Sequence, residues 1–136
     1  MKSIALKGLV VGLGLALLAN CGTSTTKPSI VGNWFAVRTA NADGSNASDL
    51  QERSSRVYTF TSDAKVCLVV LSTAGTESCG TYEQKDGSLV IKMPNPETTT
   101  ITLSADQLVI ITTASNVQHQ YRRISDQEKA TIRSRQ

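Results

Sequence analysis

Hydrophobic and polar residues alternate with a period of two over most of the chain after residue 56. In the stretch from Val57 to Thr61, Tyr58 and Phe60 fall on one face, and Thr59 and Thr61 fall on the other. Such alternation is typical of a strand that buries one face. The hydrophobic pattern predicts eight short strands, over residues 30–38, 57–61, 65–71, 77–84, 89–93, 98–104, 107–113 and 117–124.

The connections between these strands are mostly short and rich in turn residues. Asp86-Gly87 is the strongest hairpin signal, because this pair favours the positive φ that a tight turn needs. Short connections place consecutive strands antiparallel, and a meander of eight usually closes because closure removes the exposed edges. We therefore expect an all-β fold, an eight-stranded antiparallel up-and-down barrel. Ser125 and Glu128 have the spacing of a capping box and predict a short C-terminal helix.

One connection is different. Residues 39–55 are polar and form a long link for a compact domain. Such links are usually either functional or mobile, so this segment is a place to look for function.

The N-terminus resembles a targeting segment. Lys2 and Lys7 precede an uncharged apolar run over residues 8–19. A helix of that length would extend about 18 Å, well short of the ~30 Å hydrocarbon core of a bilayer. The pattern predicts a signal peptide over residues 1–20. Residues 21–29 are polar and predict a flexible tether, which leaves residues 30–136 for the domain.

Composition excludes one class of partner. The formal charge of the whole chain is +3, with 14 Lys and Arg against 11 Asp and Glu. Without Lys2 and Lys7 the balance is 12 against 11, or +1. A nearly neutral domain with 4% aromatic residues offers neither a basic stripe nor a stacking platform, so we expect no nucleic acid partner.

Two of the three cysteines have the spacing of a hairpin pair. Cys67 and Cys79 lie six residues on either side of Thr73, on the two arms of a predicted hairpin. Cross-strand positions of this kind bring Cβ atoms close enough for a disulfide, and an oxidising compartment would favour one. Two buried free thiols are the alternative.

No residue set points to catalysis or to a metal. His119 is the only histidine, and no nucleophile motif, zinc motif or phosphate-binding loop occurs in the predicted domain. We expect no enzyme activity, no cofactor and no metal site, and we expect His119 to be a structural residue.

The segment Leu18-Ala19-Asn20-Cys21-Gly22 resembles the lipobox of bacterial lipoproteins, although Asn20 replaces the usual small residue. The resemblance implies that Cys21 carries three acyl chains, palmitate among them, which is more than stable anchoring requires. Gly22 in place of an Asp implies the outer membrane, and we expect the domain to face the periplasm. An ordinary secretory signal is the alternative.

The remaining motifs resemble the small bacterial lipocalin-like domains. Gly32-Asn33-Trp34 opens the first strand, and Tyr121-Arg122-Arg123-Ile124 ends the last strand before the helix. The resemblance implies that Trp34 fills the closed end of the barrel, next to Gly32. It also implies that an Arg of the last strand stacks on Trp34. Arg123 shares a face with Tyr121, and we expect it to make this contact instead of Arg122.

Two functions remain open. The protein could bind a small apolar ligand in its barrel, and a pocket well under about 300 Å³ would argue against that. Alternatively, a filled barrel would act through its outer surface, as a structural, assembly or inhibitor protein of the envelope. Strands this short form a shallow cup, which favours a filled interior.

Overall fold

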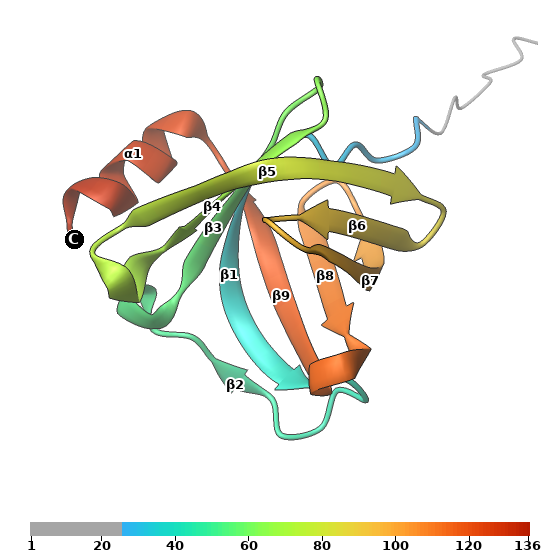
Figure 1. The fold of residues 1–136 in the computed structure, drawn as a ribbon. Coiled ribbons are helices and arrows are strands. Elements are labelled where there is room, and N and C mark those ends of the chain that lie inside the picture. Colours follow the sequence, from blue (N-terminus) through green and yellow to red (C-terminus); the bar gives the residue numbers. More distant parts are fainter. Residues whose placement is uncertain (1–25) are drawn as a thin grey trace, which may run out of the picture.

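In a computed structural model of the chain, residues 26–136 are described (Figure 1). The expected signal peptide and Cys21 lie outside the described residues. Within residues 26–136 no helix is long and apolar enough to cross a bilayer. The strands are β1 (Gly32–Asn41), β2 (Ser48–Asp49), β3 (Arg56–Phe60), β4 (Lys65–Val70), β5 (Thr76–Lys85), β6 (Ser88–Lys92), β7 (Pro96–Leu103), β8 (Gln107–Thr112) and β9 (Val117–Ile124).

All strands except β2 form a closed antiparallel barrel. Each pairs with the next along the chain, from β1–β3 through β8–β9, and β9 pairs back with β1. The all-β, eight-stranded, up-and-down barrel expected from the sequence is thus confirmed. Closure leaves no free edge between β1 and β9.

The long connection after β1 is ordered more than the sequence suggested. β1 continues to Asn41, and β2 pairs with the outer part of β1. A short 3-10 helix, η1 (Glu52–Ser54), follows. A bulge interrupts β1–β9 pairing between Ala36 and Arg38, and the connection supplies partners there. The Leu50 amide donates to the Val37 carbonyl, and the buried Ser55 hydroxyl donates to the Ala36 carbonyl. Satisfying these carbonyls holds the segment against β1.

The apolar side chains form two clusters. The first fills the barrel interior. The second lies on the outer face, where Ile132 of helix α1 (Asp126–Ser134) packs against side chains from β1, β3, β4 and β9. Two further 3-10 turns, η2 (Leu71–Thr73) and η3 (Thr113–Ser115), connect β4 to β5 and β8 to β9. The interior cluster comprises Ile30, Trp34, Ala36, Phe60, Val66, Leu89, Ile91, Ile101, Leu108, Ile110 and Tyr121.

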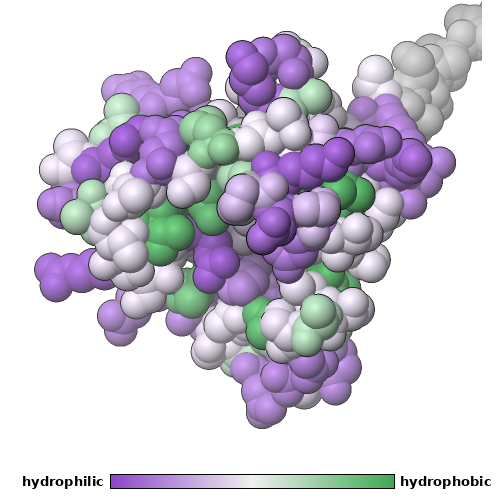
Figure 2. All heavy atoms as spheres, in the orientation of Figure 1, coloured by the Kyte–Doolittle hydropathy of each residue, from purple (hydrophilic) through white to green (hydrophobic). Residues whose placement is uncertain are grey.

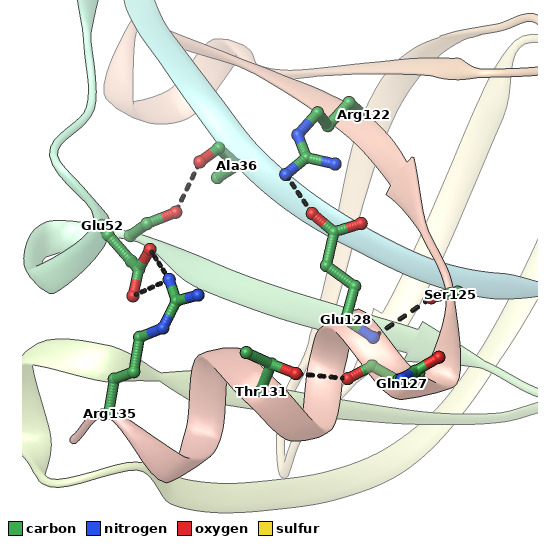
Figure 3. A network of polar contacts seen from close by, with 9 residues as sticks. Ala36, Glu52, Arg122, Ser125, Gln127, Glu128, Thr131 and Arg135 are labelled. Atoms are coloured by element: carbon green, nitrogen blue, oxygen red, sulfur yellow. Dashed lines mark hydrogen bonds and ion pairs between the residues drawn. The ribbon is translucent and has the colours of Figure 1, made fainter.

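Polar contacts fix α1 on this outer face. Ser125 caps the helix by accepting a hydrogen bond from the Glu128 amide, as expected. The Glu128 carboxylate does not complete the capping box but pairs with Arg122 of β9 (Figure 3). At the other end of the helix, Arg135 pairs with Glu52 of η1. The C-terminal helix is therefore attached to the barrel at both of its ends.

The disulfide is confirmed. Cys67 and Cys79 are directly paired across β4 and β5, and their sulfur atoms are bonded. Both cysteines lie on the outward face of the barrel, because Cys67 also pairs with outward-facing Thr59. A loop of this length stabilises a fold by about 3 kcal/mol in the chain-entropy model.

Candidate functional site

Strand direction gives the barrel two distinct ends (Figure 1). Residues 26–31 cross one end before β1 begins, and we call it the closed end. The other end carries β2, η1, η2, η3 and the turn between β6 and β7, and we call it the open end. β1, β4, β6 and β8 run towards the open end, and the other long strands run away from it.

Trp34 seals the closed end. Its side chain is completely buried, and its indole N–H donates a 2.7 Å hydrogen bond to the carbonyl of Ile30. The Arg123 guanidinium carbon lies 4.1 Å from the centroid of the ring. This distance is well inside the ~6 Å range of a cation–π interaction. The stacking that the resemblance implied for Arg123 is therefore present, whereas Arg122 lies over Phe35 on the outer face.

Arg123 also ties three backbone segments together. Its guanidinium donates 2.7 Å hydrogen bonds to the carbonyls of Ser29, Val31 and Ala105. Gly32 makes room for it, because a Cβ at this position would lie 2.5 Å from an Arg123 Nη atom. The backbone of Gly32 also has φ of +133°, which side chains rarely tolerate. Gly32 therefore meets both a steric and a conformational requirement.

The interior next to the closed end is filled. Trp34, Phe60, Leu89, Leu108 and Tyr121 are among the largest side chains that are fully buried. The expectation that a barrel with short strands would be filled holds for this half of the molecule.

The interior near the open end is only partly covered. Residues paired directly across antiparallel strands share a face, so Tyr58 and Leu68 point inward with Trp34. Both are only partly buried. On β5, Ser78 pairs with Leu68 and points inward but is exposed to solvent. We call this accessible inner surface the cup.

Figure 2 shows the face of the molecule from the view of Figure 1, indented near its centre, where hydrophilic residues lie between hydrophobic ones. Among the described residues, Val31 is the exposed large hydrophobic side chain, and it belongs to the closed end. The face around the open end thus carries no broad apolar patch of the kind that marks a large protein interface.

A positive charge points into the cup. Arg56 begins β3 two residues before Tyr58, on the same inward face, and its side chain is partly buried. Within residues 26–136, none of the ion pairs includes Arg56. The ring of Tyr121 lies 5.7 Å from that of Tyr58 and 6.3 Å from that of His119, centroid to centroid, and the charge of Arg56 lowers the pKa of all three side chains relative to burial alone.

His119 is a neutral member of this group. It pairs with Ile110 of the interior cluster and therefore points inward. Burial, and then the positive charge of Arg56, lowers the pKa of His119 to about 4. Burial likewise raises the pKa of Tyr58 and Tyr121. At neutral pH these three side chains are uncharged. One negative group also faces the region, since the carboxylate of Glu97, opposite Ile91, raises the pKa of Tyr58 as well.

The β6–β7 turn limits the depth of the cup. Met93 belongs to this turn and packs against the interior cluster. It crosses the inner face of β5 at Gly80, where a Cβ would lie 1.9 Å from the Lys92 carbonyl oxygen and 2.6 Å from Met93 Cγ. Gly80 thus permits the turn to enter the barrel. The sequence showed no signal for this, because the glycine lies within an ordinary strand pattern.

Three hollows of residues 26–136 bear on the location of a site. Two adjoin each other at the closed end between Lys27-Pro28 and Gln84, with volumes of about 630 and 150 Å³, and the smaller one reaches the inward-facing Ile101 and Leu103. The third, of about 440 Å³, lies between η2 and the end of α1. None of the three is lined by the inward-facing aromatic residues. By the criterion of about 300 Å³ given above, this argues against a ligand enclosed in the barrel. A ligand of this barrel would have to lie on the open surface of the cup.

One cluster of side chains contains residue types that commonly bind metal ions, but its ligand atoms are engaged in other bonds. Cys67, Glu77 and Cys79 lie close together on the outer face. The two sulfur atoms are bonded to each other, so neither is a thiolate. Glu77 pairs instead with Arg133 of α1.

Comparison with known proteins gives the fold. No family model matches the sequence, and no curated protein matches it. A lipocalin-like protein from Bacteroides uniformis ATCC 8492 superposes with a TM-score of 0.57 and 18% identity, covering 69% of this chain and 97% of that chain. An uncharacterized protein from Bacteroides eggerthii DSM 20697 superposes with a TM-score of 0.56 and 12% identity, covering 71% of this chain and 100% of that chain. The chain has a lipocalin-like barrel fold.

Replacing Trp34 by Ala should lower the free energy of unfolding by about 3–5 kcal/mol, because it leaves a large cavity at the closed end. Urea denaturation followed by far-UV circular dichroism measures this. Val31→Ala, at an exposed position three residues earlier, should change stability by less than about 0.5 kcal/mol. If the Trp34 variant were as stable as the Val31 variant, the closed end would be built on other contacts.

His119 should make stability depend on pH. Between pH about 4 and 6.5 the unfolded chain binds a proton at His119 that the folded chain does not, so the free energy of unfolding rises with pH across this window. The contribution is about 1–2 kcal/mol, reduced by solvent screening of a half-exposed side chain. Denaturation of the protein and of His119→Gln at several pH values isolates it. Two parallel stability curves would show that His119 titrates normally.

Proposed function

We propose that the protein is a lipid-anchored binding module of the bacterial outer membrane, which holds a small ligand with an apolar surface at the open end of its barrel. The observation that supports this is the contrast between the two ends. The closed end is sealed by buried Trp34, whereas inward-facing Tyr58 and Leu68 remain accessible in the cup. Accessible apolar surface at the mouth of a barrel is a common site for small ligands.

Anchoring through Cys21 would orient the barrel. Arg123 holds Ser29 and Val31 against the closed end. Cys21 precedes Lys27 by six residues, which can extend at most about 20 Å. The closed end would then face the bilayer, and the cup would open away from it into the periplasm. A ligand would therefore exchange with the periplasm and not directly with the lipid.

The proposal is one of binding without catalysis. His119 has a pKa near 4, which makes it a weak base at neutral pH. Arg56 lowers the pKa of His119, whereas Glu97 raises the pKa of Tyr58, and these two charged groups carry opposite signs. They do not form the pair of carboxylates or the base-activated nucleophile that hydrolytic chemistry uses.

A second candidate function acts through the outer surface. The filled half of the barrel favours this alternative, as does the hollow between η2 and α1, which is lined by Arg53, Leu71, Ser72, Arg135 and Gln136. An envelope protein bound there would leave the cup unused. This alternative becomes the better one if the cup binds no small molecule.

Native mass spectrometry tests the binding function. Protein purified from its host membrane in a mild detergent should carry a small molecule as a defined added mass. Leu68→Glu, which puts a charge on the inner surface, should lose this mass. Val109→Glu is the matched control, since Val109 pairs with Thr102 and Gln120 on the outer face and should retain it. A protein without any added mass would favour the surface function.

Lipidation can be tested at the cysteines. In cells fed a clickable palmitate analogue, the protein should take up the label, and Cys21→Ala should not. The double variant Cys67→Ala, Cys79→Ala lacks the disulfide but keeps Cys21, so it should still be labelled. Label that persists in Cys21→Ala would contradict the anchor.

A further inference from the structure

The hollow between η2 and the end of α1, which we call the arginine hollow, carries positive charge. Its volume is about 440 Å³. The residues that line it are Arg53, Leu71, Ser72, Arg135 and Gln136. Within residues 26–136, Arg53 forms no ion pair, and Arg135 gives only its Nη1 atom to Glu52, at 3.1 Å (Figure 3). Most of the donors of the two guanidinium groups are therefore available to a bound group.

The walls of the arginine hollow are fixed before anything binds. The Leu71 amide donates a 3.1 Å hydrogen bond to the Ser55 carbonyl, and the Ser55 hydroxyl donates to the Ala36 carbonyl. These bonds hold η2 and η1 against β1, and the ion pair between Arg135 and Glu52 holds the end of α1 against η1. Leu71 is 3% exposed and belongs to the outer cluster, so it gives the hollow an apolar base. Walls that are already ordered lose less conformational entropy when a partner binds.

The position and the size of the arginine hollow indicate what fits it. η1 and η2 lie at the open end, away from Lys27 and the expected anchor, so lipid headgroups of the anchoring bilayer would not reach it. An inorganic anion would fill a small part of the volume and would leave Leu71 uncovered. A peptide segment with a carboxylate next to an apolar side chain meets both requirements, because it supplies an anion to the guanidinium groups and apolar surface to Leu71.

Building on the second function proposed above, we infer that the arginine hollow docks an acidic segment of another envelope protein. The partner's carboxylate accepts parallel hydrogen bonds from Arg53, whose planar fork matches it. Arg135 adds a second positive charge, and an apolar side chain of the same segment covers Leu71. The inference rests on the surface function. It leaves the cup free, because the hollow lies on the outer face with α1 and Leu71.

Site-specific photocross-linking in the host tests the partner. With p-benzoylphenylalanine in place of Ser72, the full-length protein should cross-link to one other envelope protein. The cross-linked peptide, sequenced by mass spectrometry, should contain an acidic residue next to the attachment point. The same photoreactive residue in place of Ser115 is the matched control, since Ser115 belongs to an exposed 3-10 turn at the same end but outside the hollow. It should not form this cross-link.

A synthetic copy of the cross-linked peptide then measures the affinity by fluorescence anisotropy. Arg53→Gln should weaken binding about tenfold, the usual effect of losing a charge-assisted hydrogen bond. Ser72→Asp, which puts a like charge beside the carboxylate, should weaken it at least as much. Lys92→Gln removes an exposed positive charge at the open end of β6, outside the hollow, and should leave the affinity within about twofold, as should Ser115→Asp.

The outcomes separate the inference from the function on which it rests. If Ser72 gives no cross-link to another protein, the surface function at this hollow fails and the inference fails with it. A cross-linked peptide without an acidic residue, or an affinity that Arg53→Gln does not change, would overturn the inference and leave a surface function of another kind. An equal loss in Arg53→Gln and Lys92→Gln would also overturn it, because general surface charge would then be the cause. A cross-link to a second copy of this chain would make the hollow a self-association site and exclude the acidic partner.

Discussion

The contact between Arg123 and Trp34 is the constraint on which the rest of the structure depends. It joins the last strand to the first, where the barrel closes, and it places a cation over the ring that fills the closed end. The same guanidinium binds the carbonyls of Ser29 and Val31, so the segment that enters the barrel is fixed with it. Gly32 is needed because any side chain there would displace the guanidinium. Arg123 thus links the ring of Trp34 to the backbone around Gly32.

The two ends of the barrel differ in how far their inward-facing side chains are buried. The large side chains of the closed half, Trp34, Phe60, Leu89 and Leu108, are fully buried, whereas the β5 wall of the open half has inward-facing residues that remain exposed. The two inward-facing arginines show the same division. Arg123 is satisfied by backbone oxygens and a ring, and its role is structural. Arg56 forms no ion pair within residues 26–136. The outer face is occupied by α1, whose buried Ile132 and ion pairs at both ends stabilise the β1, β3, β4 and β9 side of the barrel.

Local patterns were enough to predict most of the fold. The period of two identified the barrel strands, the hairpin spacing of Cys67 and Cys79 identified the disulfide, and the shared face of Tyr121 and Arg123 selected the correct arginine. Features that depend on contacts between distant segments were not accessible. The ordering of residues 42–55 depends on carbonyls freed by a bulge in β1, and the entry of Met93 depends on the missing side chain of Gly80. The cup was missed for the same reason: Arg56 reads as an ordinary strand-end residue until closure brings β9 and His119 beside it.

The central claim is that the closed end is structural and the open end binds. Nuclear magnetic resonance of the ¹⁵N-labelled protein tests it directly, because the single indole N–H of Trp34 reports on the closed end and the backbone amides report on both ends. Titration with 1-anilinonaphthalene-8-sulfonate should shift the amides of Arg56, Tyr58 and His119 and leave the Trp34 indole signal in place. Shifts concentrated at Trp34, Lys27 and Gln84, with the open end unchanged, would contradict the account.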